Sequence, residues 1–284
     1  MQGTMNEVIG GFVSERDGPE PLVALELGAL TPPDLAFFLD FDGTLADFAD
    51  DPAAVAIPEE IRTALARLHD AAGGAVAVVS GRPIGDLDRM LQPLRLPLAG
   101  VHGLEWRIPS GAVRRAGFDA RALGSAARLL AEFAAANPGT FLEEKPGAVA
   151  LHYRRRPELA GEALALARTA AERSGLSLMH GKMVLELKDS AVTKAHAISR
   201  FMSLAPFAGR RPLYAGDDVT DEDAFRSLSG TGAITIKVGP GETAARFRAC
   251  DIDEFRNWLV RLAAHVNGCG SPGARRAGGM SPAR

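Results

Sequence analysis

The chain has 284 residues, of which 46% are hydrophobic and 24% are charged, and these values are ordinary for a globular protein. Its formal net charge of −3 gives no basic field that would favour nucleic acid or an anionic membrane as a partner. The two cysteines form no disulfide framework, no apolar run is long enough to span a membrane, and the N-terminus lacks the pattern of a secretion signal, so we expect a cytoplasmic protein.

Both ends of the chain lack a regular pattern. Residues 1–33 show weak hydrophobic periodicity and are predicted to form an N-terminal tail. Residues 267–284 are rich in Gly, Pro, Ser and Arg and are predicted to form a disordered C-terminal tail. The folded part of the chain is therefore expected between residues 34 and 266.

Within that part, apolar strands alternate with helices. The predicted strands are 35–41, 75–80, 97–103, 212–216 and 233–238. The predicted helices are 58–74, 194–202, a segment after the "DEDAF" run, and 253–266. Continuous apolar strands separated by helices are typical of a parallel sheet with helices on both faces, so the predicted fold class is α/β with a Rossmann-like core.

Residues 105–185 have a different pattern, which predicts a second domain inserted into the first. Hairpins are expected around Pro109–Gly111 and at Pro146–Gly147, and helices over 119–136 and 157–174. Hairpins with two helices are typical of an antiparallel sheet covered on one side. The core would then consist of 34–104 and 186–266, with an α+β cap domain between them.

The first predicted strand ends in "DFDGT", which carries Asp40 and Asp42. In a parallel α/β sheet, ligands bind in the crevice beyond the carboxyl ends of the strands, and this is where both carboxylates are expected. Gly43 would let the backbone turn sharply there. A turn-capping role would explain one aspartate but not the whole motif.

A second strand ends in carboxylates, in the segment "YAGDDVTDEDAF", with Asp217, Asp218 and Asp221. Acids from two strand ends at one sheet edge would repel one another in a partly desolvated cleft. A hard divalent cation such as Mg²⁺, which prefers carboxylates, water and phosphate oxygens, would relieve this repulsion. The alternative, an acidic cap of the following helix, fits Asp223 better than Asp217.

Two further residues are suited to binding phosphate. Ser80, in "VVSGRP", ends the second strand and offers a hydroxyl group, although Ser-Gly alone is only a turn signal. Lys194 lies at a predicted helix start, where the helix dipole disfavours a cation unless an anion is bound nearby. Neither residue is specific by itself.

In this order, "DFDGT", "VVSGR", a lysine and "GDDVTDED" resemble the four motifs of the haloacid dehalogenase superfamily of phosphohydrolases. The segments "LAGVHGLE", "LHYR", "HGKMVLELK" and "FAGRRPLYAGDDVTDEDAF" are similar to the trehalose-6-phosphate phosphatase family. The resemblance covers residues 34 to 265. One departure is Ala195, where the family commonly has Gly after the motif lysine, and we expect little effect because alanine suits a helix start.

This resemblance implies a division of roles in the core. Asp40 would be the nucleophile that forms an aspartyl-phosphate, and Asp42 the general acid and then the general base. Mg²⁺ would be bound by Asp40, the carbonyl of Asp42, and Asp217. Ser80 and Lys194 would hold the phosphoryl oxygens.

Two more acids, Asp218 and Asp221, would orient metal-bound water or Lys194 according to the same resemblance. The predicted substrate-binding residues are Gly81, Arg82, Glu105, Lys145, Arg154, Lys182 and Glu186. Lys182 and Glu186 are four residues apart in an apparent strand and would share one face of it. The alternative is that these charged residues form a solvated, salt-bridged sheet face.

The six histidines show no metal-ligand spacing. His102, which follows the third strand, could border the site, but structural packing is the expected role. The predicted function is Mg²⁺-dependent hydrolysis of trehalose 6-phosphate, with a trehalose-6-phosphate synthase as a further partner. Two alternatives stay open: a capped phosphatase for another sugar phosphate, such as sucrose phosphate or a mannosyl-phosphoglycerate, and a catalytically silent sugar-phosphate-binding module.

Overall fold

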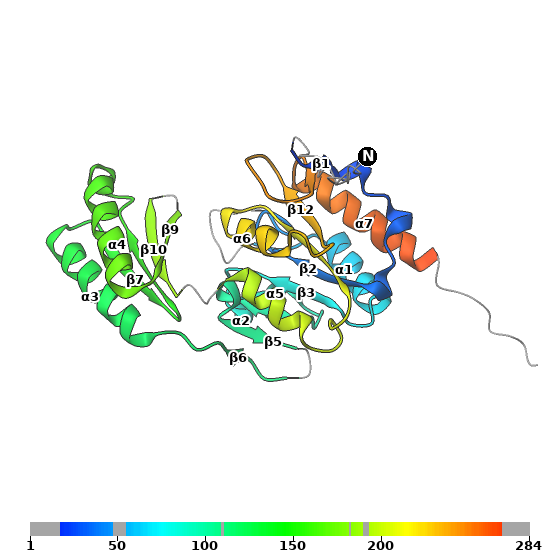
Figure 1. Cartoon of the computed structure of the whole chain (residues 1–284), viewed down its shortest axis with the longest axis horizontal. Helices are drawn as coiled ribbons and strands as arrows, with labels where there is room; N and C mark the ends of the chain where they lie inside the picture. The colour runs from blue at the N-terminus through cyan, green and yellow to red at the C-terminus, as the bar shows by residue number, and fades with distance from the viewer. Residues whose placement is uncertain (1–17, 48–54, 109–110, 182, 190–192, 269–284) are drawn as a thin grey trace, which may run out of the picture.

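The computed structural model describes residues 18–47, 55–108, 111–181, 183–189 and 193–268. The chain forms a larger α/β core and a smaller cap, which lie side by side and are joined by two passages of the chain (Figure 1). No helix in these ranges is both long and apolar enough to cross a membrane. The predicted C-terminal tail lies outside the described residues from 269 onward.

The core is built on a sheet of nine strands in the order β1-β13-β12-β11-β2-β3-β4-β5-β6. The seven strands from β1 to β4 in this order pair in parallel, and β5 and β6 continue the sheet antiparallel. The parallel strands are β1 (Glu20–Pro21), β2 (Leu35–Leu39), β3 (Val76–Val79), β4 (Leu98–Gly100), β11 (Arg211–Gly216), β12 (Ile234–Val238) and β13 (Phe247–Ala249). The predicted α/β fold class is confirmed.

Helices cover both faces of this sheet. They are α1 (Glu59–Ala71), α2 (Ile84–Leu91), α5 (Lys194–Met202), α6 (Val219–Leu228) and α7 (Ile252–Gly268). Helix α1 follows Pro58 and buries a stripe of Ile61, Leu65 and Leu68, whose spacing of three and four residues puts them on one side. It packs against α7, while α5 packs against α6.

The described part of the predicted N-terminal tail is folded onto the core. Leu22 and Leu30 are only 1% and 4% exposed and belong to the main hydrophobic cluster. Three short 3₁₀ helices, η1 (Leu22–Ala24), η2 (Leu27–Ala29) and η3 (Pro32–Asp34), follow β1, which pairs with β13. Weak periodicity concealed this segment because 3₁₀ turns bury isolated residues rather than a regular stripe. Residues 1–17 lie outside the described ranges.

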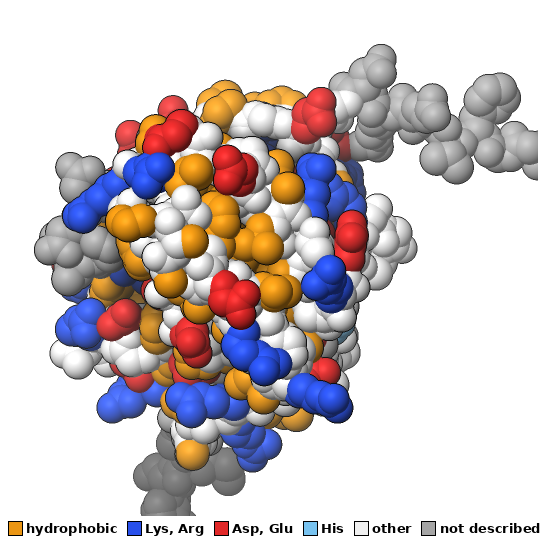
Figure 2. All heavy atoms as spheres, turned by 90° about the vertical axis from the view of Figure 1, so that its left-hand side faces the viewer, with side chains coloured by type: hydrophobic (Ala, Val, Ile, Leu, Met, Phe, Trp, Pro, Cys, Tyr) orange, Lys and Arg blue, Asp and Glu red, His pale blue; other side chains and the backbone are white. Residues whose placement is uncertain are grey.

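The cap has its own sheet, in the order β7-β8-β10-β9, with antiparallel pairing throughout. Its elements are α3 (Ala120–Ala136), β7 (Phe141–Lys145), β8 (Ala148–His152), η6 (Pro157–Leu159), α4 (Ala160–Ser174), β9 (Ser177–Gly181) and β10 (Val184–Lys188). Leu130, Leu151 and Leu187 are fully buried between the sheet and the two long helices, in a second hydrophobic cluster. Figure 2 looks onto the outer side of the cap, where acidic and basic side chains are interspersed with apolar ones.

The strand pairing differs from the predicted domain boundaries at both ends of the insert. Strands β5 (Glu105–Arg107) and β6 (Arg114–Arg115) extend the core sheet through β4, although the sequence placed them in the cap. Strand β10 pairs within the cap sheet up to Lys188, where the sequence had already returned to the core at 186. A hairpin pattern alone does not say which sheet the hairpin joins.

The two segments that connect the core and the cap are joined by a hydrogen bond. The backbone N–H of Asp119, just before α3, donates to the Asp189 carboxylate just after β10, at 2.8 Å. Asp119 in turn caps α3, because its carboxylate accepts from the backbone N–H groups of Arg121 and Ala122 at 2.9 Å. The N–H of Asp189 donates to the carbonyl of Gly147 in the β7–β8 turn at 3.3 Å.

Candidate active site

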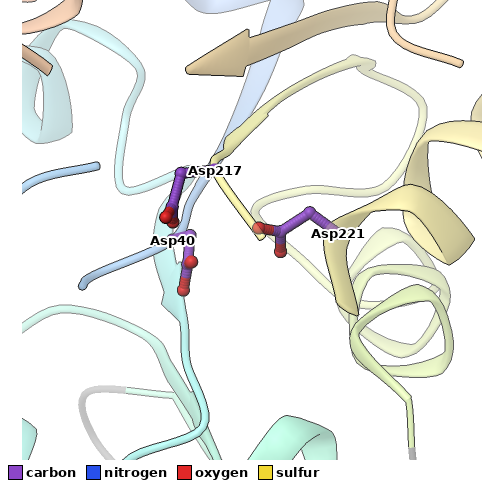
Figure 3. Close-up of side chains that lie close together, drawn as sticks. All are labelled: Asp40, Asp217 and Asp221. Carbon is purple, nitrogen blue, oxygen red and sulfur yellow. The ribbon is translucent and has the colours of Figure 1, made fainter. Parts of the chain in front are cut away.

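The strands β2 and β11 are neighbours, so their carboxyl ends bring two acidic motifs together. The N–H of Asp40 donates to the carbonyl of Ala215 at 2.9 Å, which continues the pairing of the two strands to the sheet edge. Asp217 follows β11 directly. Figure 3 shows the carboxylates of Asp40 and Asp217 close together, with Asp221 reaching toward them from the start of α6.

A buried lysine joins two of these acids. The Lys194 ammonium lies 2.8 Å from an oxygen of Asp40 and 2.6 Å from an oxygen of Asp221. Lys194 is the first residue of α5, whose N-cap is Thr193. The anionic partners explain a lysine at this positive helix end, because two carboxylates outweigh the unfavourable helix dipole.

The charges in this cluster depend on one another. Burial would lower the pKa of Lys194, but the attraction of Asp221 and Asp40 outweighs it and raises the pKa above the ordinary value. Burial raises the pKa of Asp40 well above its usual range, against the lowering effect of Lys194. Burial would also raise the pKa of Asp221, yet the charge and hydrogen bond of Lys194 and the Tyr214 hydroxyl lower it. The ammonium is therefore held as a fixed positive charge beside Asp40.

One acid of the cluster serves as a support rather than as an open ligand. Asp221 accepts from Lys194 and from the Tyr214 hydroxyl through one oxygen, and from the N–H of Asp218 at 2.9 Å through the other. With both oxygens engaged, Asp221 orients Lys194. Asp218 itself is exposed and lines the same hollow as Asp40 and Asp217.

The acidic cluster has the composition and spacing of a metal site. Asp40, Asp217 and Asp221 each offer an oxygen atom, and these atoms lie within 4.8 Å of one another. Burial and the charge of Asp221 raise the pKa of Asp217 to about 6, and a cation bound beside it would favour its ionised form. Oxygen-only donors with buried negative charge are what a hard divalent cation prefers. Asp40 and Asp217 are the carboxylates best placed to hold it, because the oxygens of Asp221 already have donors.

Two contacts fix the position of Asp217. The Lys237 ammonium, at the end of β12, donates to the main-chain carbonyl of Asp217. On the opposite side, Gly43 has φ +74°, and a Cβ atom built there would lie only 2.1 Å from an Asp217 carboxylate oxygen. The glycine of "DFDGT" is thus required both for its left-handed backbone and for the approach of Asp217.

The predicted acid–base residue is held by an arginine. Asp42 accepts two hydrogen bonds from Arg82, one from Nε and one from a terminal nitrogen, each 2.7 Å long. Sequence reasoning assigned Arg82 to the substrate, but in the structure its guanidinium group binds Asp42. Ser80 is buried, and its hydroxyl oxygen accepts from the N–H of Arg82 at 3.1 Å.

These residues surround a hollow with an empty volume of about 550 Å³. Its lining contains the four predicted catalytic residues together with five further positions: Asp40, Asp42, Ser80, Gly81, His102, Lys194, Asp217, Asp218 and Thr220. We call it the phosphoryl chamber. It brings all four predicted motifs to one place.

A second hollow lies between core and cap, and we call it the cap crevice. Its lining combines three core residues with the β7–β8 turn and the end of β10 from the cap: Gly81, Val101, His102, Lys145, Pro146, Gly147, Ala148, Glu186 and Lys188. The Lys145 ammonium lies 3.3 Å from a Glu186 oxygen, so the two predicted sugar-binding residues form an ion pair on this wall.

Sequence reasoning missed two charged residues of the cap wall. Lys188 is only 5% exposed and lines the crevice, and burial lowers its pKa. Glu143 lies 3.4 Å from Lys145 and 2.8 Å from His152. Period-two alternation could have found both, because Glu143 shares a strand face with Lys145, as Lys188 does with Glu186.

The other predicted sugar-binding residues have different surroundings. Glu105 is buried, and its carboxylate accepts from the N–H of Ile84 at 3.3 Å and pairs with Arg115 at 3.0 Å. In this structure it therefore links β5 to the start of α2. Arg154 is exposed just beyond the end of β8. Lys182 lies outside the described residues, and β10 begins only at Val184.

Comparison with known proteins identifies the family. A family model described as trehalose-phosphatase matches residues 38–251. The chain belongs to the trehalose-phosphatase family. It is 41% identical over 210 residues to a probable trehalose-phosphate phosphatase of Sinorhizobium fredii, covering 72% of this chain and 78% of that protein. It is also 37% identical over 228 residues to trehalose-6-phosphate phosphatase of Escherichia coli, covering 80% and 86%.

Solved structures agree on the fold. The C-terminal domain of trehalose-6-phosphate phosphatase from C. albicans superimposes with a TM-score of 0.73 at 23% identity, covering 88% of this chain and 99% of that chain. The family match and the curated relatives make the chain an enzyme of the haloacid dehalogenase type, a phosphoric monoester hydrolase.

Proposed function

We propose that this trehalose-phosphatase hydrolyses trehalose 6-phosphate through an aspartyl-phosphate formed on Asp40, with Mg²⁺ as its cofactor. The observation that carries the proposal is the buried Lys194, which bridges Asp40 and Asp221 beside Asp217. Lys194 opposes the rise that burial causes in the pKa of Asp40, so together with a bound cation it would keep the nucleophile ionised, and it can attract a phosphoryl group at the same time. When bound between Asp40, Asp217 and the Asp42 carbonyl, Mg²⁺ would neutralise charge on the phosphoryl oxygens.

In the first step, a carboxylate oxygen of Asp40 attacks phosphorus, and the bond from phosphorus to the sugar oxygen breaks. The Lys194 ammonium and the Ser80 hydroxyl bind phosphoryl oxygens as negative charge shifts toward the leaving group. The leaving sugar oxygen takes a proton from Asp42. Because Asp42 accepts two bonds from Arg82 in the structure, it must leave Arg82 to carry that proton.

In the second step, a water molecule attacks the phosphorus of the aspartyl-phosphate, and Asp42 accepts the water proton. The two hydrogen bonds from Arg82 hold the Asp42 carboxylate in a fixed orientation beside the phosphoryl chamber. The bond between phosphorus and the Asp40 oxygen then breaks, which releases inorganic phosphate and restores the Asp40 carboxylate. Oxygen from solvent water should therefore appear in the phosphate and not in Asp40.

The cap crevice supports a sugar as the leaving group. Lys145, Glu186 and Lys188 present charged groups beside the phosphoryl chamber, and charged groups bind hydroxyls strongly in a partly desolvated site. The names of the relatives from S. fredii and E. coli favour trehalose phosphate among sugar phosphates. A silent binding module would have no need for Asp40, Asp42, Lys194 and Asp217 together.

The decisive experiment measures phosphate release from a panel of sugar phosphates, with Mg²⁺ and with excess chelator. Trehalose 6-phosphate should be hydrolysed fastest, and chelator should abolish turnover until Mg²⁺ is added back. Asp40→Asn keeps the shape of the side chain but removes the nucleophile, so its turnover should fall by at least about four orders of magnitude. Activity in excess chelator, or a rapid Asp40→Asn variant, would contradict the proposal.

A synthase that makes trehalose 6-phosphate is a second proposed partner. The proposal rests on the chemistry of the pathway alone, since the ester must be formed before it is hydrolysed. Co-elution of the two purified enzymes on a sizing column, with and without the substrate, would test it. Independent elution at micromolar concentrations would argue against a stable complex.

A further inference from the structure

A strained turn joins the fourth strand of the core sheet to the hairpin that follows. In the short helix η5 (Val101–Gly103), Val101 has φ +48° and His102 has φ +55°. Left-handed backbone is rare outside glycine, and for a β-branched residue such as valine it is a true outlier. Strain of this kind persists only where the surroundings impose it, and it is concentrated at functional sites.

Hydrogen bonds tie this turn to the second catalytic motif. The N–H of Val101 donates to the carbonyl of Arg82, and the N–H of His102 donates to the carbonyl of Ser80, both at 3.0 Å. The His102 ring lies directly over Gly81, where a Cβ atom would meet the ring at 2.7 Å. On the far side, a Cβ atom at Gly103 would lie 2.7 Å from the carbonyl of Thr193, the N-cap of the Lys194 helix. The turn therefore sits between the serine and lysine motifs.

The imidazole ring of His102 stands where the two hollows meet. Together with Gly81 it lines both the phosphoryl chamber and the cap crevice. Its Nδ1 atom is shielded from solvent and has no hydrogen-bond partner among the described residues. Because Nδ1 is shielded, a ligand in either hollow would meet the ring through its other nitrogen, Nε2.

The electrostatic surroundings keep this ring uncharged. Burial and the nearby Lys194 and Lys188 lower the pKa of His102 to about 3. A neutral imidazole has one N–H donor and one acceptor nitrogen. It therefore suits an uncharged sugar oxygen better than a phosphoryl oxygen, for which Lys194 already supplies a cation.

We propose that His102 is a substrate-binding residue, whose imidazole hydrogen-bonds a sugar oxygen next to the phosphate ester as the strained turn Val101–Gly103 holds it over Gly81. This inference rests on the proposed function, because it concerns the sugar phosphate of that same site. It replaces the expectation that His102 only packs. The ring would contact the substrate between its phosphoryl group, which the core binds, and the rest of its sugar, which the cap binds.

The left-handed backbone makes a clean test possible. His102→Gly removes the imidazole while placing a residue that adopts φ +55° without strain, so the melting temperature should not fall. His102→Gln keeps an amide donor near the position of the ring Nε2. The control is His69→Asn, since His69 lies in α1 of the core, outside both hollows, and its Nδ1 is likewise buried without a partner.

For His102→Gly, loss of a neutral hydrogen bond should raise the KM for trehalose 6-phosphate about three- to tenfold, with kcat changed less. Turnover of p-nitrophenyl phosphate, which has no sugar oxygen, should change little. His102→Gln should lose less than His102→Gly, and His69→Asn should keep the wild-type KM. Calorimetric binding of trehalose 6-phosphate to Asp40→Asn, with and without His102→Gly, should show the same loss without turnover.

Unchanged KM and binding in the His102→Gly variant would overturn the inference. Equal loss on both substrates with a lower melting temperature would overturn it as well, because a structural role alone produces that result. The proposed function fails in a distinguishable way: the wild-type enzyme would then release no phosphate from any sugar phosphate, whatever residue occupies position 102.

Discussion

The core and the cap contribute to the site in different ways. In the core, Asp40, Lys194 and Asp221 are almost fully buried and are bonded to one another before any substrate arrives. In the cap, Lys145 and Glu186 are only partly buried, and their ion pair is open to a crevice. The core site is thus preorganised, whereas the cap wall has to be brought against the sugar.

This difference assigns phosphoryl transfer to the core and recognition of the sugar to the cap. Groups that stabilise the transferring phosphoryl must be fixed in advance, because reorganising them during the reaction would raise the barrier. Groups that recognise the sugar can act through binding energy that closes the cap and orients the ester. Substitutions in the core should therefore affect every phosphate ester, and substitutions in the cap should affect sugar phosphates selectively.

The largest effect is expected for Lys194→Met in the core. This change leaves Asp40 and Asp221 buried without their cation, so we expect turnover of all esters to fall at least about a thousandfold and the metal-free protein to lose about 3–5 kcal/mol of stability. The measurements are phosphate release and urea unfolding. Adding Asp221→Asn should restore much of the stability but none of the turnover. If the single variant kept its stability, the buried charge network would not be a fixed unit.

In the cap, Glu186→Ala should lower kcat/KM for trehalose 6-phosphate by about ten- to a hundredfold, the loss of one charged hydrogen bond. Hydrolysis of p-nitrophenyl phosphate should change little. Glu144→Ala is the matched control, because Glu144 is the neighbouring acid on the other side of strand β7 from Lys145. The same assay applies to Lys182→Ala, which we predict to be selective too. Equal loss on both substrates would mean that the cap also supports the core chemistry.

The smallest expected effect is the pH dependence of Mg²⁺ binding to the core site. Asp217, whose pKa is raised to about 6, must lose its proton to bind a metal ion. Below that pH, protons compete with Mg²⁺ for the Asp217 carboxylate. The dissociation constant for Mg²⁺ should therefore rise as pH falls, by about tenfold between pH 7 and pH 5. Titration calorimetry over this range would measure it. A constant affinity would show that Asp217 is not a ligand.

The core site could be predicted from the sequence because its chemistry is local to short motifs. Asp40 and Asp217 each end a strand of continuous apolar residues, and neighbouring parallel strands must place such ends together. The partner of Arg82 could not be predicted, since only the folded loop decides whether a guanidinium group reaches Asp42 or a substrate. For the same reason the sequence could not show that the Glu105 carboxylate accepts from the N–H of Ile84 and pairs with Arg115, and its contact with the sugar stays a prediction.

The cap was predicted less well, because its function depends on sheet register. Alternation along β7 and β10 would have added Glu143 and Lys188 to Lys145 and Glu186, yet only the register shows that these four meet on one wall. The hairpin of β5 and β6 was assigned to the cap for a related reason, as its pattern fits either sheet. The sequence suggested only that His102 could border the site, since the left-handed backbone that holds its ring over Gly81 cannot be seen in any spacing.

The hydrogen bond between Asp119 and Asp189 bears on how the cap is inserted into the core. It joins the entry and the exit of the insert, so about seventy residues leave and return at one point. A chain that leaves and returns at one point adds little closure entropy to the fold around it, because that cost grows only slowly with the length of the insert. The cap can therefore be replaced or lengthened in evolution without disturbing the core, and the catalytic chemistry of the core stays the same.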